Sequence, residues 1–290
     1  MIRINNEWND YEIIRTGDGY KLEMYSQKYK FLRPDPQVIW KADPSFDFER
    51  ECDAFYSRNN DGGGLWTSNN QIPEEFFVHW RELTFSLKLM GFKHTGIFPE
   101  QAYNWARIID TIKNSQSNNP SVLNLFAYTG GATAACLLAG ASVCHVDAAK
   151  SMCERAKRNL NLSGLGLNKV RFIVDDCIKF VEREGNRGKK YDAIIMDPPS
   201  FGRGPKGETW KITDQIYELV QKTKKLLSEK PLFFLVNSYT TGLQPTSMKV
   251  ILDKIYKDIP HDCEAYEIGI QTKEKEVVLP CGASAFMVFK

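Results

Sequence analysis

The sequence predicts an α/β fold: a doubly wound, mostly parallel seven-stranded sheet, preceded by a small β-rich domain. Short apolar runs alternate with helical segments from about residue 98 onward. These runs are apolar almost throughout, as strands covered on both faces are. The first ninety-odd residues show hairpin turns and period-two alternation instead. We therefore expect a β-rich domain over residues 1–95 and a larger α/β domain over residues 96–290.

The β-rich part begins with a predicted hairpin from Tyr11 to Tyr25, whose two runs flank Gly17-Asp18-Gly19. Residues 61–64 read as an exposed turn. Residues 83–90 alternate between apolar and polar side chains, which is the period of a half-buried strand.

The α/β part supplies strands and helices in alternation. The expected strands are 122–126, 142–146, 170–174, 191–196 and 232–236, closed by a terminal antiparallel pair at 265–270 and 283–289. The expected helices are 99–112, 132–138, 150–160, 178–184 and 212–228. This βαβ order requires a parallel sheet with helices on both faces.

Composition fits an ordinary globular chain, with 42% hydrophobic and 26% charged residues. No run approaches the roughly 20 apolar residues of a membrane helix, and the start is not a signal peptide. Seven cysteines without a C-x-x-C pair indicate reduced thiols in a cytoplasmic protein and no metal site. Residues 1–95 carry 12 Lys and Arg against 15 Asp and Glu, and the rest carry 26 against 21. This mildly basic part permits an RNA or DNA partner, although ordinary surface charge explains it equally well.

The first candidate binding segment is the turn after the strand at 122–126. It consists of Ala127, Tyr128, Thr129, Gly130 and Gly131 and leads directly into a helix. Two glycines there let the backbone approach a ligand closely, although such a turn also serves packing. The next glycine is Gly140, so the dinucleotide fingerprint G-x-G-x-x-G is absent.

Acidic residues close the next two strands. Asp147 ends the second strand, where a carboxylate can accept hydrogen bonds from both hydroxyls of a ribose. Asp175 and Asp176 end the third, where a carboxylate can accept from an adenine amino group while the N–H of Cys177 serves a ring nitrogen. The alternative for all three carboxylates is to cap the helix that follows.

The fourth strand ends in Asp197-Pro198-Pro199-Ser200-Phe201. The two prolines fix their φ angles and restrict the residue before them, so the backbone carbonyls point in set directions. A carboxylate beside a fixed carbonyl can hold a planar amino group from two sides, and an aromatic ring can stack on a base. On the fourth strand of this series, the segment indicates methyl transfer.

With these four segments, the chain resembles class I S-adenosylmethionine-dependent methyltransferases, which have a Rossmann-like fold. Within them it is similar to the 23S ribosomal RNA cytosine-5 methyltransferases and their uncharacterised relatives. The resemblance runs from about His94 to the end, on HTGIFPEQ, LNLFAYTGGATAA, HVDAAKSM, DDCIKF and DPPSFGRGPKGE. It implies methyl transfer from S-adenosylmethionine to RNA, with ribosomal RNA the expected class.

Position by position, the resemblance implies cofactor contacts at the glycine turn, a ribose contact at Asp147 and an adenine contact at Asp176. It also implies a cofactor contact at Gln101. The segment from Asp197 to Phe201 would face the methyl group and the acceptor.

The chain departs from that family at the cysteine that cytosine-5 methylation needs as a nucleophile. Tyr239 stands where the thiol follows the fifth strand, and Ser200 occupies the other known placement. Cys281 lies near the last strands and is a poor candidate. Carbon-5 chemistry is therefore disfavoured.

We expect methyl transfer to a base nitrogen, with Asp197 and the Pro198 carbonyl orienting the acceptor. Phe201 and Tyr239 would supply the stacking surface, although in related amino-group methyltransferases the aromatic follows the second proline directly and here Ser200 intervenes. Further acceptor contacts are expected from side chains of the same loop, which otherwise form a solvated segment: Ser200, Arg203, Lys206 and Lys211.

Three alternatives stay open. One is a protein or small-molecule acceptor, because no RNA-binding module is visible. Another is a cofactor-binding protein without catalysis. A nicotinamide-dependent oxidoreductase is disfavoured by the missing fingerprint and by Asp-Pro-Pro.

Overall fold

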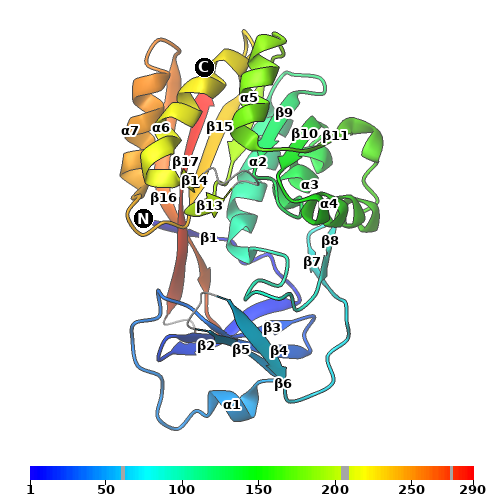
Figure 1. Ribbon diagram of the computed structural model, residues 1–290, viewed down its shortest axis with the longest axis vertical. Helices are drawn as coiled ribbons and strands as arrows, with labels where there is room; N and C mark the ends of the chain where they lie inside the picture. Colours follow the sequence, from blue (N-terminus) through cyan, green and yellow to red (C-terminus); the bar gives the residue numbers. More distant parts are fainter. Residues whose placement is uncertain (60–62, 204–208, 275–276) are drawn as a thin grey trace. The chain divides into compact units, whose positions relative to one another are not determined.

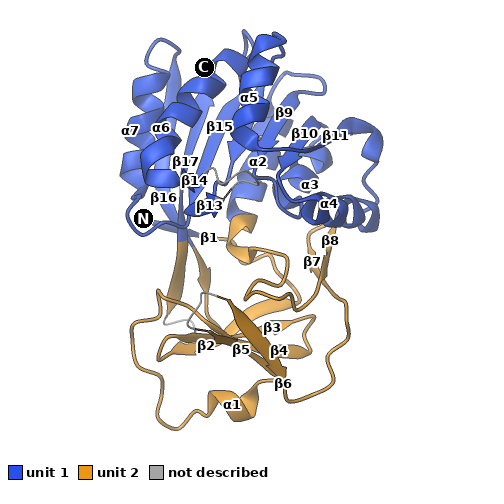
Figure 2. Ribbon diagram, in the orientation of Figure 1, with its two compact units in different colours: residues 1–3, 103–268, 282–290 blue, residues 4–102, 269–281 orange. Residues whose placement is uncertain are grey.

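The computed structural model describes residues 1–59, 63–203, 209–274 and 277–290. The chain forms two compact units (Figure 2). Unit 1 comprises residues 1–3, 103–268 and 282–290, and unit 2 comprises residues 4–102 and 269–281. Unit 2 thus takes its residues from two separate stretches of the chain. The domain limits expected from the sequence, 1–95 and 96–290, stay a prediction.

Unit 1 is built on an eight-stranded sheet of order β1-β16-β17-β15-β12-β9-β10-β11 (Figure 1). The strands are β1 (Ile2–Ile4), β9 (Ser121–Leu125), β10 (Ser142–Asp147), β11 (Val170–Val174), β12 (Ala193–Met196), β15 (Phe233–Ser238), β16 (His261–Gln271) and β17 (Val278–Phe289). The five strands from β15 to β11 are parallel, and β17 pairs antiparallel with β15. The doubly wound, mostly parallel fold class is confirmed.

The expected strand count of seven was one too low. The eighth strand, β1, has three residues and lies beside β16 at the edge of the sheet. A three-residue strand shows no measurable period, and its pairing partner lies more than 250 residues away along the chain.

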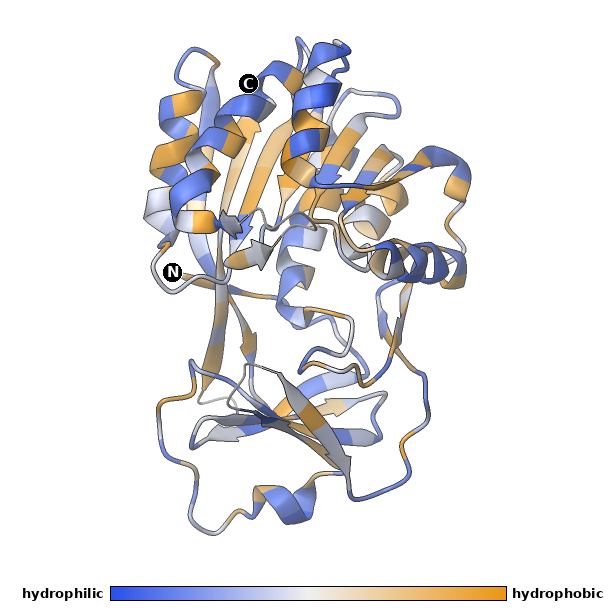
Figure 3. Ribbon diagram, viewed as in Figure 1, coloured by the Kyte–Doolittle hydropathy of each residue, from blue (hydrophilic) through white to orange (hydrophobic). Residues whose placement is uncertain are grey.

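Helices cover both faces of this sheet. They are α2 (Ala102–Asn114), α3 (Gly131–Leu138), α4 (Lys150–Leu162), α5 (Cys177–Asn186), α6 (Ile212–Thr223) and α7 (Pro245–Ile255). Helices α5, α6 and α7 share one hydrophobic core with side chains such as Leu125, Met196 and Val236. Helix α3 contacts β9 and β10, and helix α4 contacts β10 and β11. The central strands are therefore apolar on both faces, as Figure 3 shows.

The expected helices all occur, with small differences at their ends. The stretch from Pro99 is a 3₁₀ turn (Pro99–Gln101) that continues into α2, and α6 is followed by the 3₁₀ turn Lys224–Leu226 rather than reaching Ser228. Another 3₁₀ turn, Leu167–Lys169, precedes β11. Besides β1 and this turn, the unexpected elements of unit 1 are α7 and the short antiparallel hairpin of β13 (Phe201–Arg203) and β14 (Thr209–Lys211).

Unit 2 contains a five-stranded sheet of order β2-β3-β4-β5-β6 and a two-stranded sheet of β7 and β8. Its elements are β2 (Tyr11–Gly17), β3 (Tyr20–Tyr25), β4 (Tyr29–Pro34), α1 (Phe48–Glu51), β5 (Ala54–Arg58), β6 (Gly64–Ser68), β7 (Phe76–Trp80) and β8 (Leu83–Leu87). The expected hairpin is β2 and β3. The expected strand at 83–90 ends at Leu87. Of the expected turn at 61–64, residues 61 and 62 lie outside the described residues, and Gly64 begins β6.

Candidate functional site

The order of the strands places the candidate site at the carboxyl ends of β9 and β12. From β9 the chain proceeds outward through β10 and β11, then returns to β12 on the other side of β9 and proceeds to β15. Ligands of open parallel sheets bind outside the carboxyl ends of the strands at such a reversal. The glycine turn follows β9, and the Asp-Pro-Pro segment follows β12.

The turn after β9 has an unusual backbone. Phe126 and Tyr128 have φ angles of 54° and 50°, and Gly130 has a φ of 86°. A left-handed conformation costs a residue with a side chain roughly 1–2 kcal/mol, and such residues cluster at binding sites. Residues 126–130, which we call the cofactor loop, therefore keep this shape only because neighbouring groups hold it.

Hydrogen bonds from three neighbouring elements hold the cofactor loop. The Tyr128 N–H donates to Oδ2 of Asp147 at 2.8 Å, and the Ala127 N–H donates to the Val146 carbonyl at 3.0 Å. On the other side, Nδ2 of the buried Asn159 donates to the Thr129 carbonyl at 2.9 Å. The Phe126 N–H points to the thiol of Cys177, with 3.3 Å between nitrogen and sulfur.

The two glycines of the turn make room for neighbouring side chains. A Cβ on Gly131 would lie 2.3 Å from the ring of Trp105 on α2. A Cβ on Gly130 would lie 3.0 Å from that of Ala156 on α4, in addition to the positive φ. The packing alternative is thus realised at both positions, whereas close approach to a ligand stays a prediction.

Asp147 is largely withdrawn from solvent at the end of β10. Its second oxygen, Oδ1, accepts from the Ala149 N–H at 2.8 Å. The N-cap of α4 is Ala149, which has no capping side chain, so Asp147 is not itself the cap. Burial raises the pKa of Asp147, and its two backbone hydrogen bonds oppose this. A carboxylate has about four acceptor sites, so two remain for a ligand such as a diol.

The acidic pair after β11 has partners within the chain. Asp176 is the N-cap of α5 and accepts from the Lys179 N–H at 2.9 Å, so the capping alternative is realised there. Asp175 forms an ion pair with Arg183 and accepts from the Asp176 N–H. Cys177 is the first residue of α5, and burial raises the pKa of its thiol. An adenine contact at these residues stays a prediction.

The Asp-Pro-Pro segment is tied to its surroundings by backbone hydrogen bonds. The Asp197 N–H donates to the Leu125 carbonyl at 3.4 Å, which joins the segment to β9. The Pro199 carbonyl accepts from Nε1 of Trp210 at 2.6 Å. Within the described part of the chain, the Pro198 carbonyl accepts no hydrogen bond. The carbonyl with capacity for a ligand is therefore that of Pro198.

Phe201 begins the hairpin and is 53% exposed, a large value for a phenylalanine. The preceding Ser200 accepts a 2.6 Å hydrogen bond through Oγ from Oγ1 of Thr240, in the segment after β15. Beside Thr240, the ring of Tyr239 lies 3.0 Å from where a Cβ on Gly282 would be. The described contacts therefore link the ends of β12 and β15.

The remaining expected site residues lie on several elements, and their roles stay a prediction. Gln101 is buried in the 3₁₀ turn Pro99–Gln101 and belongs to unit 2, as does Cys281. Arg203 lies on β13, and Lys206 lies outside the described residues. Lys211 pairs with Asp214 at 3.2 Å.

None of the seven cysteines is prepared as a nucleophile. Burial raises the pKa of every thiol, to about 11 for Cys144 and Cys153 and to about 12 for Cys263. The same direction holds for Cys52, Cys136, Cys177 and Cys281. A catalytic thiol needs the opposite shift.

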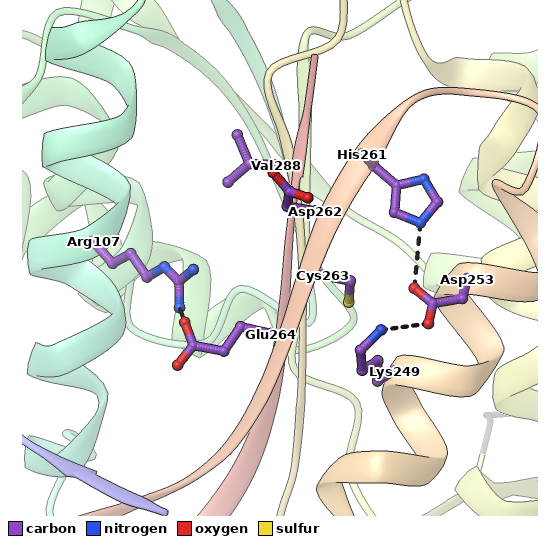
Figure 4. A pocket seen from close by; sticks show the side chains of 8 residues that line it. All are labelled: Arg107, Lys249, Asp253, His261, Asp262, Cys263, Glu264 and Val288. Atoms are coloured by element: carbon purple, nitrogen blue, oxygen red, sulfur yellow. Dashed lines mark hydrogen bonds and ion pairs between the residues drawn. The ribbon is translucent and has the colours of Figure 1, made fainter.

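A cavity of about 500 Å³ lies elsewhere in unit 1, where α2, α7, β16 and β17 meet (Figure 4). Its charged side chains pair with one another: Arg107 with Glu264 at 2.8 Å, and Asp253 with Lys249 at 2.5 Å and His261 at 3.3 Å. No residue expected at the site lines it. Because its charges are already paired, we place the chemistry at the strand ends.

Two kinds of feature are absent from the described ranges. No group of His, Cys, Asp and Glu side chains there has the arrangement of a metal site. None of the helices among those residues has the length and apolarity that a membrane span requires.

Sequence reasoning missed the supports of the cofactor loop. Asn124, Thr133, His145 and Asn159 are all fully or almost fully buried polar residues. A polar residue inside an apolar strand, such as His145 between Cys144 and Val146, is the signal that would have indicated a buried network.

Comparison with known proteins agrees with this geometry. The family model of S-adenosylmethionine-dependent methyltransferases matches residues 55–240. The ribosomal RNA large subunit methyltransferase K/L of Shewanella frigidimarina is 34% identical over 146 residues, which make up 50% of this chain and 20% of that protein. The ribosomal RNA large subunit methyltransferase I of Escherichia coli is 42% identical over 84 residues, 29% of this chain and 21% of that protein. The matched segments thus span about a fifth of the length of these curated relatives.

Two solved structures extend the comparison to nearly the whole chain. The SAM-dependent methyltransferase of Agrobacterium tumefaciens is 30% identical with a TM-score of 0.92, over 99% of this chain and 93% of that one. A methyltransferase complexed with S-adenosylhomocysteine shares the fold, with 17% identity and a TM-score of 0.75 over 98% of this chain and 76% of that one. The resemblance seen in the sequence is confirmed. The chain belongs to the S-adenosylmethionine-dependent methyltransferase family.

Proposed function

We propose that this methyltransferase modifies a base nitrogen of an RNA, with ribosomal RNA as the substrate class. The observation that carries the proposal is the segment from Asp197 to Phe201 at the strand reversal. It places a carboxylate, a carbonyl with acceptor capacity and an exposed aromatic ring next to one another in the chain. Those groups suit a planar amino-bearing base.

The residues at the strand ends fit the cofactor. Asp147 has acceptor capacity left for the two hydroxyls of a ribose, and it also supports the cofactor loop through Tyr128. The sulfonium of bound S-adenosylmethionine supplies an electrophilic methyl group. We assign the ribose to Asp147 and the adjoining contacts to the cofactor loop and Gly131. The family resemblance implies a further cofactor contact at Gln101. The cap Asp176 and the neighbouring Asp175 and Cys177 would border the adenine.

The protein's part in the transfer is alignment. Asp197 and the Pro198 carbonyl would accept the N–H groups of the acceptor and turn its nitrogen lone pair toward the methyl group. Phe201 would stack on the base, and Tyr239 would close the other side. Well-oriented reactants gain on the order of 7–11 kcal/mol of the barrier in this way. Pro199 has a supporting role, because its carbonyl holds Trp210 of the hairpin.

Nitrogen is favoured over carbon 5 because no thiol has a lowered pKa and Tyr239 stands at the family's cysteine position. RNA is favoured because the relatives with 34% and 42% identity are ribosomal RNA methyltransferases by name. Ser200, Arg203 and Lys206 would meet the acceptor's backbone from the same loop.

The test is transfer of labelled methyl from S-adenosylmethionine to total RNA from a strain lacking the gene, followed by nucleoside analysis. We expect the label on a base nitrogen. Digestion of the RNA to nucleotides should release this label from the polymer. Asp197→Ala should abolish transfer and leave cofactor binding largely intact. Label on cytosine carbon 5, or on protein instead of RNA, would refute the proposal.

A further inference from the structure

His145 is a buried histidine for which the proposed methyl transfer has no role. It lies on β10, two residues before Asp147, and its relative exposure is 0%. Its Nδ1 lies 2.9 Å from Oγ1 of Thr133 on α3. Asn124, its register partner on β9, donates through Nδ2 to the same hydroxyl oxygen at 3.0 Å. Three buried polar side chains therefore form one chain, Asn124–Thr133–His145.

The contact between Thr133 and His145 suits the imidazole tautomer that carries its proton on Nε2. The Thr133 oxygen accepts from Asn124 and keeps one proton, which it can donate to Nδ1 of His145. A ring that accepts at Nδ1 carries its own proton on Nε2. Burial lowers the pKa of His145 to about 4, so the ring is neutral at physiological pH.

The ring of His145 lies directly against the cofactor loop. A Cβ on Gly130 would lie 3.7 Å from Cε1 of His145, the ring carbon between the two nitrogens. Nε2 is buried and makes no well-formed hydrogen bond within the described part of the chain. An interaction with the Tyr128 backbone raises the pKa of His145 and partly opposes the effect of burial, which identifies the Tyr128 carbonyl as the acceptor within reach of the ring. A buried N–H next to a carbonyl, but outside good geometry, needs only a small shift of one peptide group to form its hydrogen bond.

We propose that His145 is a positioning residue for cofactor binding, whose Nε2–H bonds the Tyr128 carbonyl when the cofactor occupies the loop. Asp147 holds the N–H of Tyr128, and His145 would hold the carbonyl of the same residue. The N–H and the carbonyl of Tyr128, a residue in a left-handed conformation, would then both be held by side chains of β10. The inference rests on S-adenosylmethionine binding at this loop and is independent of the acceptor.

Nuclear magnetic resonance of ¹⁵N-labelled imidazole tests the tautomer directly, with S-adenosylhomocysteine as the ligand. His145 should be neutral with its proton on Nε2 from pH 5.5 to 8. Saturation with ligand should move the Nε2 proton resonance downfield, as a new hydrogen bond to a carbonyl requires. A proton on Nδ1, a charged ring, or an Nε2 resonance that does not respond to saturation would overturn the proposal.

Two substitutions separate positioning from packing. Gln in His145→Gln offers an N–H near the position of Nε2, whereas Leu in His145→Leu fills a similar volume with no donor. One hydrogen bond corresponds to about a 3- to 10-fold change in the dissociation constant for S-adenosylhomocysteine, measured by calorimetry. We expect that loss for His145→Leu and recovery of most of it for His145→Gln.

The controls keep the result interpretable. Thermal unfolding of each variant reports its stability, and Thr133→Val removes the hydroxyl that favours this tautomer without touching Nε2. In Thr133→Val the ring should show a mixture of tautomers and an intermediate affinity. Equal affinity in wild type, His145→Leu and His145→Gln would mean that His145 only packs. If His145→Leu does not fold, the resonance shift and the Gln variant still decide. Failure to methylate RNA would leave these measurements unaffected, whereas failure of the wild type to bind the ligand would overturn the shared premise.

Discussion

The Tyr128 N–H donates a 2.8 Å hydrogen bond to Oδ2 of Asp147, and this bond joins the two segments from which a nucleoside site would be made. Tyr128 has a positive φ, and Asp147 supplies a partly buried carboxylate whose pKa is raised by burial. The carboxylate expected to bind the ribose therefore also maintains the shape of the loop beside it. Removing it has two consequences for the cofactor.

Asp147→Ala should weaken S-adenosylhomocysteine binding by at least about 100-fold. The change removes the expected acceptors of two ribose hydroxyls and leaves the Tyr128 and Ala149 N–H groups without their partner. Each hydrogen bond to a charged group contributes about 1.5–3 kcal/mol. Calorimetry measures the affinity, and Asp258→Ala is the control, because Asp258 pairs with Lys224 and has no predicted role in binding. The control should bind the ligand with wild-type affinity. An equal affinity loss in the two variants would contradict the ribose role of Asp147.

As the pH falls, cofactor binding should begin to weaken at a higher pH than it would if Asp147 had the usual pKa of an aspartate. Burial raises the pKa of Asp147, so its carboxylate takes up a proton earlier as the pH falls. A protonated carboxyl loses acceptor capacity for the ribose. His145 does not contribute above about pH 5, because its pKa is lowered to about 4. The dissociation constant measured from pH 7.5 to 4.5 should rise in wild type and remain nearly flat in Asp147→Asn.

The raised pKa of Asp147 makes folding depend on pH in the opposite direction from cofactor binding. A carboxyl whose pKa is raised in the folded state binds a proton more tightly there than in the unfolded chain. Its contribution to stability therefore decreases as the pH rises through the interval between the two pKa values. Asp147→Asn should remove this dependence from the free energy of unfolding, measured as the pH rises from the usual pKa of an aspartate, about 3.9. A stronger dependence in the variant would contradict the assignment.

Phe201→Ala should weaken acceptor binding and leave cofactor affinity unchanged. Stacking of a base on an aromatic ring contributes about 1–3 kcal/mol, which corresponds to roughly a 5- to 150-fold loss. The measurement is the KM for RNA beside the dissociation constant for S-adenosylhomocysteine. Tyr217→Ala is the matched control, because Tyr217 on α6 is 46% exposed against 53% for Phe201. An equal rise in the KM for RNA in the two variants would contradict the stacking role of Phe201.

Much of this architecture was predictable because it depends on local pattern. The run at 170–174 is the strand β11 without any change of its ends, and α4 begins at Lys150 as expected. The hairpin of β13 and β14 was not predicted because strands of three residues each are too short to show a period. It also depends on contacts outside the hairpin, such as the hydrogen bond from Trp210 to the Pro199 carbonyl. Helix α7 begins with Pro245, a helix-start signal that was not used.

The candidate site likewise contains residues that local sequence pattern predicts and residues that depend on contacts made only in the folded chain. Asp147 and the glycine turn were found because strand ends in a βαβ series are local features with a fixed place in the sheet. Asn159 was missed because its bond to the Thr129 carbonyl joins residues 30 apart, and nothing in the sequence around either residue marks it. The role of Gly131 also depends on Trp105, which only the folded chain brings against it.

Gly131→Ala should destabilise unit 1 because the space for its methyl group is already filled. The new Cβ would lie 2.3 Å from one ring carbon of Trp105 and 2.9 Å from another, too close for any real contact. Over-packing of this kind costs about 1–3 kcal/mol, and a midpoint of thermal unfolding lower by roughly 2–12 °C is expected. Gly242→Ala is the control, because nothing lies within 4 Å of its added Cβ and its φ is not positive. The control should unfold near the wild-type temperature. If Gly131→Ala keeps its stability and loses only cofactor affinity, close approach of a ligand, and not the Trp105 ring, is the reason for the glycine.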